Sequence, residues 1–363
     1  MHYSGKAVAE RLRPKSAAIA QPIRDQIITS RIYRLVVSLR RSRNLACRRV
    51  IGLPGFDWIL LMRVGEAEPV MLTELAAWLG IDKGQASRNV NRIAEMGLIR
   101  RRTTRGEIEL TSNGRRLYER GLPLSRKRHR ELIAGASTAE LKNFRSTFPK
   151  LLNNSKRLLD LEQGQVPNST ESEPLQNAKY LFPWTQTFRP IPMLAGIYGI
   201  IRRSGDYAYE RVLGLSDFDW RVLSRSGASS EITLVQLVNE LDRDKSQVGR
   251  AVKRLSALGL FNTTKIGSSR NVRISLTEKG KKAYGQLERV AFERHKSLIN
   301  GLSPRELALL ESLFAKFASN ADQMLIEETS YAERGRPYSA TRDPATKVPK
   351  GRPRKREAYE RVQ

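Results

Sequence analysis

The sequence predicts a mainly α-helical protein with small β-hairpins, built from two copies of one unit in tandem. Three observations predict this fold class. Apolar residues recur at helical spacing over most of the chain. A block of residues recurs after a constant shift in numbering, and in both copies two short β-prone runs follow the same helix. We therefore expect two helical domains, each with a small β-hairpin.

The charge balance of the chain indicates a polyanionic partner. Lys and Arg number 65 against 37 Asp and Glu, which gives a formal net charge of +28. For a chain of ordinary hydrophobic content, nucleic acid is the commoner partner for such an excess. A membrane surface is the alternative, but the longest apolar run, Ile191 to Ile201, is far shorter than the roughly 20 residues of a spanning helix. The composition therefore favours a cytoplasmic, nucleoid-associated protein.

Cysteine usage and the first residues of the chain point to the same compartment. The first twenty residues contain basic side chains but no apolar core, so we expect no secretory signal. Cys47 is the single cysteine, which excludes an intramolecular disulfide and a four-cysteine zinc site. It lies near Arg43, Arg48 and Arg49, which would lower a thiol pKa if the side chain were exposed. A redox sensor is thus an alternative to a small buried residue.

The internal repeat defines the organisation of the chain. Gly-Phe-Asp-Trp, which ends at Trp58, recurs as Asp-Phe-Asp-Trp, which ends at Trp220. From Thr111, which matches Thr277, the shift between the copies is larger by four, so the second copy holds four extra residues in a connection, where insertions are best tolerated. The pairs that align in the same register as the two tryptophans include Leu72 and Leu234, Leu75 and Leu237, Asp82 and Asp244, Gln85 and Gln247, Arg88 and Arg250, Arg92 and Arg254, and Gly97 and Gly259.

Both copies give the same predicted order of elements. A mixed apolar and basic helix comes first, at about 22–42 and 191–209, and a second helix carries the repeated Trp. A third helix has a leucine stripe, and a fourth begins at Asp82 or Asp244 with Gln three residues later, a capping signature. A glycine ends the fourth helix, two β-prone runs follow, and two more helices complete the copy.

Helix, tight turn, helix and hairpin is the order of a winged helix-turn-helix, whose second helix enters the major groove of DNA. We expect one face of that helix to be buried and the opposite face to bind DNA. Gln and Asn can pair bidentately with adenine and Arg with guanine, at roughly 1–3 kcal/mol of discrimination per pair, whereas Lys and Ser more often hold phosphates. An ordinary solvated helix face is the alternative. The DNA-binding candidates are Lys83, Gln85, Ser87, Arg88, Asn91 and Arg92, and in the second copy Lys245, Ser246, Gln247, Arg250, Lys253 and Arg254.

Five segments of the second copy resemble the MarR (multiple antibiotic resistance regulator) family of winged-helix proteins. These segments are Leu-Gly-Leu-Ser at 213–216, Asp-Lys-Ser-Gln at 244–247, Arg-Ala-Val-Lys-Arg-Leu at 250–255, Gly-Leu at 259–260 and Ile-Ser-Leu-Thr-Glu-Lys-Gly at 274–280. The resemblance covers both copies and is stronger in the second. It implies that the first, fifth and sixth helices of each copy form a dimerisation layer.

The resemblance also implies an arginine at the wing tip that enters the minor groove. In the second copy this is Arg270, with Ser268 where the family usually has an acidic partner, and Arg273 follows on the second strand. The first copy has a shorter wing with Arg105 near its tip. The family further implies a small-molecule effector that binds between the DNA-binding lobe and the dimer helices.

A basic C-terminal segment adds a second kind of candidate DNA contact. Pro-Lys-Gly-Arg-Pro-Arg-Lys-Arg at 349–356 resembles an AT-hook, in which Gly351 lets the backbone approach the groove floor, Arg352 inserts and Pro353 keeps the chain extended. Lys350 and Arg354 flank this core, and narrow A-tract grooves attract such cations. A generic basic tail that binds phosphates by counterion release is the alternative.

The predicted domain boundaries follow from these patterns. We expect a flexible N-terminal arm at 1–21, a winged helix-turn-helix domain at 22–162, a Pro/Ser-rich linker at 163–190, a second such domain at 191–328 and a disordered basic tail at 329–363. The linker of roughly 27 residues extends to about 90 Å, well beyond the ~34 Å between half-sites one DNA turn apart. We therefore expect an intramolecular pseudo-dimer that reads an asymmetric site, with a homodimer as the alternative.

The predicted function is sequence-specific binding of double-stranded DNA and transcriptional regulation. The alternatives are an architectural or silencing protein on A·T-rich DNA and a plasmid replication initiator. No P-loop, paired-carboxylate spacing or Ser-His-Asp pattern favours an enzyme. His129 and His295 occupy matching positions without carboxylate or cysteine companions, so we expect no metal site and no cofactor.

Overall fold

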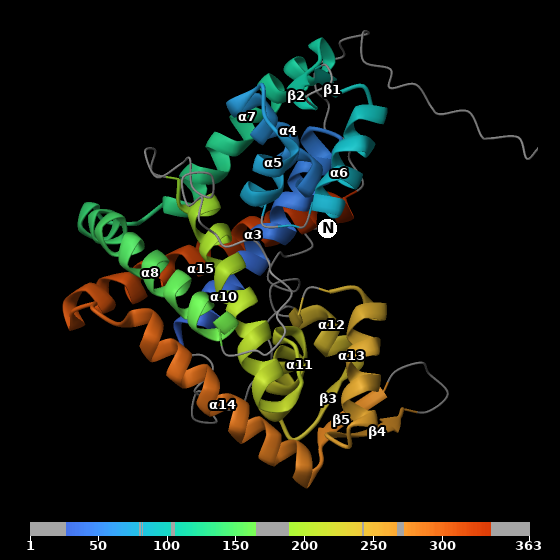
Figure 1. The fold of residues 1–363 in the computed structure, drawn as a ribbon, viewed down its shortest axis with the longest axis vertical. Coiled ribbons are helices and arrows are strands. Elements are labelled where there is room, and N and C mark those ends of the chain that lie inside the picture. The colour runs from blue at the N-terminus through green and yellow to red at the C-terminus, as the bar shows by residue number, and fades with distance from the viewer. Residues whose placement is uncertain are drawn as a thin grey trace, which may run out of the picture.

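The computed structural model describes residues 27–79, 81, 83–102, 106–164, 189–241, 243–266 and 272–334. Figure 1 shows two small lobes on the right of the view, one above the other, that are carried by a layer of long helices. The first half of the chain forms α3 (Ile28–Val50), α4 (Gly55–Ala67), α5 (Leu72–Leu79), α6 (Lys83–Glu95), β1 (Ile99–Arg102), β2 (Glu107–Leu110), α7 (Ser112–Ile133) and α8 (Thr138–Gly164).

The second half repeats this order and adds one short strand. Its elements are α10 (Pro190–Leu213), α11 (Asp217–Gly227), β3 (Ile232–Thr233), α12 (Leu234–Leu241), α13 (Lys245–Ala257), β4 (Phe261–Lys265), β5 (Val272–Leu276), α14 (Glu278–Ile299) and α15 (Pro304–Glu333). We call the part from α4 to β2 lobe 1 and the part from α11 to β5 lobe 2. The described helices of the chain include none that is long and apolar enough to cross a membrane.

Polar side chains fix where the helices begin, much as the sequence predicts. Ser216 and Asp219 form a capping box at α11, and the Asp244 side chain accepts a hydrogen bond from the Gln247 backbone N–H at the start of α13. The Thr277 hydroxyl accepts a hydrogen bond from the Gly280 backbone N–H at the start of α14. Such caps satisfy backbone groups that a helix terminus leaves without intrahelical partners.

Two glycines are required by close packing against the end of the helix before the wing. A Cβ atom on Gly114 would collide with the Leu98 carbonyl oxygen, and one on Gly280 would collide with the Leu260 carbonyl oxygen. The repeated Leu-Thr-x-x-Gly pattern therefore combines a helix cap with a close backbone approach. This arrangement fixes the angle at which α7 and α14 leave the lobes.

Small antiparallel sheets complete the lobes. In lobe 1, β1 pairs with β2 so that Ile99 faces Leu110. In lobe 2, β5 lies between β3 and β4. The isolated bridge between Val70 and Ile108 in lobe 1 is the counterpart of the β3–β5 pair, where Ile232 faces Ile274. The third strand was not predicted, because two residues are too few to show a β pattern.

Each lobe has its own apolar core around the repeated tryptophan. Trp58 is 2% exposed and Trp220 is 7% exposed, so both are core residues. The Trp58 core contains Leu60, Leu61, Val64, Leu75, Val90, Ile93 and Ile108. The Trp220 core contains Val222, Leu223, Leu237, Leu241, Val248, Leu255 and Ile274.

A third core joins the two halves of the chain. It is built from α3, α8, α10 and α15 and from the ends of α7 and α14, so each half supplies about half of its side chains. α3 packs along α15, and α10 packs along α8, so the first helix of each half lies on the last helix of the other. The largest side chains buried here include Phe144, Phe148, Phe314 and Phe317, whose rings pack edge to face or tilted.

Hydrogen bonds across this core occur in reciprocal pairs. On α8, Asn154 Nδ2 donates to the Asn300 carbonyl at the end of α14, at 2.8 Å. On α15, Asn320 Nδ2 donates to the Ala134 carbonyl at the end of α7, at 2.9 Å. The register that matches Thr111 with Thr277 also matches the two donors with each other and the two acceptors with each other. Contacts of this kind, in which residue i meets j and j meets i, are the mark of a two-fold interface.

Ion pairs follow the same reciprocal rule. Arg49 on α3 binds Glu328 on α15 with a shortest N–O distance of 2.6 Å, and Arg211 on α10 binds Glu162 on α8 at 2.9 Å. The two halves are therefore related as the subunits of a symmetric dimer are, within one chain.

Several predicted boundaries differ from the structure. The first helix continues to Val50 rather than ending near residue 42, and α15 continues to Glu333, past the expected domain end at Glu328. The ring of Tyr331 stacks on Arg49 at 4.4 Å, which extends the packing of α15 on α3 beyond Glu328. The residues of α15 after Glu328 are mostly polar and show no apolar repeat at helical spacing, so the sequence did not predict that this part of the helix packs on α3. The N-terminal arm lies outside the described residues, as do 165–188 of the linker and 335–363 of the tail.

The ion pairs of the shared core generate a prediction on pH. Glu140 on α8 accepts hydrogen bonds from Lys316 Nζ on α15 (2.7 Å), and also from Ser312 and from the Ser137 backbone, and these bonds lower its pKa to about 2. The pKa of Glu in an unfolded chain is about 4.3. Because the folded pKa is the lower one, Glu140 contributes stability above about pH 4 that is lost as the pH falls toward 2.

We therefore expect the melting temperature of the wild-type chain to fall more steeply between pH 5 and pH 3 than that of Glu140→Gln. Glu293→Gln, which changes an exposed carboxylate on α14, should fall as steeply as the wild type. Parallel curves for the wild type and Glu140→Gln, followed by circular dichroism, would contradict this role of Glu140.

Candidate nucleic-acid interface

α6 and α13 occupy equivalent places in the two lobes and have equivalent buried faces. Val90 and Ile93 of α6 are fully buried, as are Val248 and Leu255 of α13. Gly97 (φ 70°) and Gly259 (φ 72°) end the turns after these helices in the left-handed conformation, which confirms their predicted role. With one face fixed in the lobe core, the opposite face is presented to solvent. In Figure 1 both helices lie at the right-hand edge of the molecule.

The structure brings the predicted DNA-binding side chains of each helix together on its solvent-facing side. Ser87 is half-buried; the others are exposed. Arg88 and Arg250, at matching positions, form no hydrogen bond or ion pair with any described residue, so their guanidinium groups are available for a ligand. The exposed candidates are Lys83, Gln85, Arg88, Asn91, Arg92, Lys245, Ser246, Gln247, Arg250, Lys253 and Arg254.

Arg92 and Arg254 differ from the other candidates because each is bound to a buried carboxylate of its own lobe. Arg92 Nη2 contacts Asp57 Oδ1, and Arg254 Nη2 contacts Asp219 Oδ1. The aspartates are 3% and 4% exposed, whereas each arginine is 51% exposed. The sequence predicted that these two arginines would lie free on the helix surface. In the structure each is instead held by an aspartate. They tie α6 to α4 and α13 to α11.

The two partner aspartates, Asp57 and Asp219, were not predicted from the sequence as partners of these arginines. Both belong to the repeated Phe-Asp-Trp motif, and both stand 35 residues before their arginine. The signal was present, because the aspartates and the arginines recur at the same shift. A charge repeated inside an otherwise apolar motif indicates a buried partner, since a lone carboxylate is costly to bury.

The wings of the two lobes carry different charges. In lobe 1, β1 continues after Ile99 with Arg100, Arg101 and Arg102, all exposed. The matching segment of lobe 2 is Asn-Thr-Thr, followed by Lys265. Arg273 on β5 is exposed and lies 3.4 Å from Glu231. The wing-tip candidates Arg105 and Arg270, with Ser268, lie outside the described residues, and so do Lys350, Gly351, Arg352, Pro353 and Arg354 of the tail.

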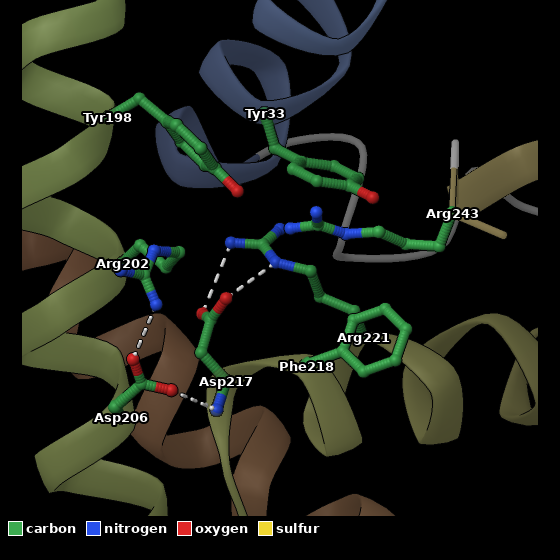
Figure 2. A pocket seen from close by; sticks show the side chains of 8 residues that line it. All are labelled: Tyr33, Tyr198, Arg202, Asp206, Asp217, Phe218, Arg221 and Arg243. Carbon is green, nitrogen blue, oxygen red and sulfur yellow. Dashed lines mark hydrogen bonds and ion pairs between the residues drawn. The ribbon is translucent and has the colours of Figure 1, made fainter. Parts of the chain in front are cut away.

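A small pocket of about 50 Å³ lies where lobe 2 meets the shared helices. Figure 2 shows that the lining comes from α3, α10 and α11, together with Arg243 from the connection between α12 and α13. The lining residues are Tyr33, Tyr198, Arg202, Asp206, Asp217, Phe218, Arg221 and Arg243.

Arg221 is the centre of this pocket. Its guanidinium binds both carboxylate oxygens of Asp217, with Nε–Oδ2 at 2.7 Å and Nη2–Oδ1 at 3.1 Å. It also stacks on the ring of Tyr33, 3.9 Å from the ring centroid, as Figure 2 shows. Tyr33 in turn donates a hydrogen bond from its hydroxyl to the Leu241 carbonyl at 3.0 Å. A helix of the first half is thereby fastened to lobe 2.

The pocket carries an excess of one positive charge. Arg202 pairs with Asp206 at 2.9 Å, and Asp206 also accepts a hydrogen bond from the Asp217 backbone N–H. Burial raises the pKa of Asp206. Arg243 lies 5.7 Å from the Phe218 ring centroid and has no carboxylate partner among the described residues. Three guanidinium groups therefore face two carboxylates.

Lobe 1 repeats the backbone of this site but not its charges. Asn44 accepts a hydrogen bond from the Gly55 backbone N–H at 3.0 Å, as Asp206 does from Asp217. In the register that aligns the two tryptophans, Gly55 stands for Asp217, Ile59 for Arg221 and Ile81 for Arg243. The charged pocket is therefore a property of lobe 2.

The remaining candidate sites have structural explanations. Cys47 is fully buried, and burial raises the pKa of its thiol to about 11, which removes the basis for a low-pKa redox thiol. His295 Nδ1 accepts a hydrogen bond from the Ile28 backbone N–H at 3.2 Å. Within the described ranges, no group of His, Cys, Asp and Glu side chains is arranged to hold a metal ion.

Comparisons with known proteins agree with the description of lobe 1. Residues 51–107 match a family model described as MarR family. No curated protein matches the chain. Matching solved structures include a MarR/EmrR family transcriptional regulator from Acinetobacter sp. ADP1, with 27% identity, 37% of this chain and 93% of that chain covered, and a TM-score of 0.32.

Two other matching structures have names that mention a ligand. A mutant MarR from E. coli, complexed with operator DNA, is 24% identical and covers 36% of this chain and 96% of its own, with a TM-score of 0.31. The other is BpsR from Bordetella bronchiseptica, whose DNA binding is regulated by 6-hydroxynicotinic acid. It is 23% identical, the match covers 31% of this chain and 92% of BpsR, and the TM-score is 0.28. The family match over residues 51–107 supports a MarR-type winged helix in lobe 1.

Proposed function

We propose that this chain is a transcriptional regulator that binds double-stranded DNA through two winged helix-turn-helix lobes. The two lobes are tandem copies of one domain and act as an intramolecular pseudo-dimer on an asymmetric site. α6 and α13 are its recognition helices, and their exposed side chains contact the major groove.

One observation carries this proposal: the two lobes hold equivalent helices, each with an apolar face buried in the core of its own lobe and a basic face exposed to solvent. Arg88 and Arg250 stand at the same position of these helices without a described partner. If these faces were merely solvated, there would be no reason for an arginine without a described partner to recur at the same position of both helices. The net charge of +28 and the family match over residues 51–107 point in the same direction.

The reciprocal contacts of the shared core support the pseudo-dimer. In a dimer of two identical chains the same contacts would join separate molecules, whereas here both partners of each pair belong to one chain. The lobes are not equivalent, because only lobe 2 has the charged pocket and only lobe 1 has three consecutive arginines on its wing. An asymmetric protein of this kind fits an asymmetric DNA site.

We assign Arg92 and Arg254 a positioning role in this function. Each holds its recognition helix against the helix before it through a buried aspartate, and half of its surface stays exposed. The direct readers are then Arg88, Asn91, Arg250 and their neighbours. The AT-hook-like tail follows Arg334, whose guanidinium lies 5.1 Å from the Tyr331 ring centroid near the end of α3. Its basic residues add minor-groove contacts.

Arg250→Ala should weaken binding to a selected operator and reduce sequence preference. The guanidinium of Arg250 is exposed on α13 and pairs with no described residue, so its loss should cost about 1–3 kcal/mol at a specific site and much less on random DNA. Fluorescence anisotropy with specific and random duplexes as competitors measures this ratio.

Lys296→Ala is the matched control, since it removes one positive charge from α14 and should change both affinities little. An unchanged ratio for Arg250→Ala would refute base reading by α13. Genome-wide occupancy separates the alternative functions: few sharp sites fit a regulator, broad A·T-rich coverage an architectural protein, and a single origin a replication initiator.

We further propose that the pocket of lobe 2 receives the anionic group of a small-molecule effector. Its excess positive charge lies on Arg243, and the aromatic rings of Tyr33 and Phe218 flank the guanidinium groups. A volume of about 50 Å³ suits one carboxylate rather than a whole aromatic molecule. A ligand there would compete with Asp217 for Arg221 and so alter the contact between α3 and lobe 2.

With 6-hydroxynicotinic acid as the probe, we expect wild-type DNA affinity to change with ligand concentration. Arg243→Gln should reduce this response at least tenfold in ligand concentration, because it removes the unpaired cation, a loss on the order of 1.4 kcal/mol. Ile81→Val, at the matching position of lobe 1, should respond as the wild type does. The same response from Arg243→Gln would exclude this pocket as the effector site.

A further inference from the structure

Asn91 of α6 is held by the wing of its own lobe. Arg101 Nη2 on β1 donates a hydrogen bond to Asn91 Oδ1 at 3.1 Å. Asn91 continues the stripe of half-buried Ser87 and exposed Arg88, because residues three and four apart share one side of a helix. The bond therefore lies within the face that the proposed function assigns to DNA.

Arg101 differs from the arginines beside it. Arg100 Nε contacts Glu109 Oε1 at 2.6 Å, and Arg102 Nη1 lies 3.8 Å from Glu109 Oε2. Successive side chains of a strand point to opposite faces, so Arg101 points the other way, toward α6. Among the described residues, no carboxylate pairs with Arg101. Its charge is available to a ligand, and its position is fixed by the amide of Asn91.

The bond changes what Asn91 can recognise. An asparagine amide has one acceptor oxygen and two donor hydrogens, and bidentate pairing with adenine uses both kinds. One lone pair of Oδ1 accepts from Arg101, and the other lies beside the guanidinium, whose positive charge repels a donor group of a base. The pair therefore presents only donors to a base: the amide hydrogens of Asn91 and the remaining N–H groups of Arg101. In the major groove guanine presents two acceptors, N7 and O6, whereas adenine presents one acceptor and one donor. A surface made only of donors matches guanine.

Lobe 2 reaches the same chemistry with different residues. In the register that aligns Trp58 with Trp220, Lys253 on α13 stands for Asn91 and Thr263 on β4 stands for Arg101. An ammonium group is also a donor without an acceptor. Each lobe thus has one cation at this place, on the wing strand in lobe 1 and on the helix in lobe 2.

We infer that Asn91 and Arg101 form a donor-only pair that selects guanine in the half-site of lobe 1. Arg101 is the specificity-determining partner, because it both supplies donors and removes the acceptor that adenine needs. This inference rests on the proposed DNA-binding function. It predicts that the loss of Arg101 releases Asn91 Oδ1 and shifts the preference from guanine toward adenine.

The test uses a duplex selected from random DNA with the full-length wild-type chain, and all single-base variants of that duplex. Anisotropy titrations give the ratio of affinities for guanine and adenine at each position. We expect one guanine in the lobe 1 half-site to lose its preference by about tenfold in Arg101→Met, in line with the discrimination of a bidentate pair. Arg100→Met removes the same group from the same strand on the other face and should leave this ratio unchanged.

The outcomes separate the inference from the function on which it rests. Uniform weakening by Arg101→Met with an unchanged guanine-to-adenine ratio would reduce Arg101 to a phosphate contact and overturn the inference while leaving the proposed function intact. An equal shift in Arg100→Met would overturn it as well. If the wild-type chain selects no duplex from random DNA, the proposed function itself fails. Both side chains are exposed, so we expect both variants to fold, and melting curves check this.

Discussion

The apolar core shared by α3, α8, α10 and α15 is the constraint on which the rest of the molecule depends. Neither half could keep these long helices without the other, because each helix buries its apolar face against a helix of the opposite half. The lobes are small and have cores of their own, and they take their orientation from this layer. Reciprocal bonds such as Asn154 to Asn300 and Asn320 to Ala134 then fix the register. Burying a dimer interface inside one chain makes the pairing of the lobes independent of concentration.

The two halves differ most at the places where we propose ligand contacts. The contacts that hold the shared core are repeated nearly unchanged, as Arg49–Glu328 and Arg211–Glu162 illustrate. The differences lie at the pocket and on the wings, where Ile59 replaces Arg221 and an arginine run replaces Asn-Thr-Thr. In a homodimer, a substitution at either place would change both half-sites at once. A single chain can change one lobe without changing the other, so the proposed pseudo-dimer fits the proposed asymmetric site.

Much of the fold could be predicted from the sequence because its signals are local or repeated. The caps at Ser216, Asp244 and Thr277, and the positive-φ glycines Gly97 and Gly259, depend on nearby residues. What escaped prediction depends on distant contacts. The Arg254–Asp219 pair, the Arg101–Asn91 bond and the stacking of Arg221 on Tyr33 each join residues whose proximity only the folded chain creates. The continuation of α15 past Glu328 also depends on a distant contact, because Glu328 and Tyr331 both contact Arg49 of α3.

In the proposed function, one chain supplies both DNA-binding lobes of the functional unit. The most direct test is the mass of the protein, alone and on one selected duplex, by size-exclusion chromatography with multi-angle light scattering. We expect a particle of one chain, 41.2 kDa, in free solution and a complex of one chain per duplex. A stable assembly of two chains with four DNA-binding lobes, in solution and on the duplex, would contradict it.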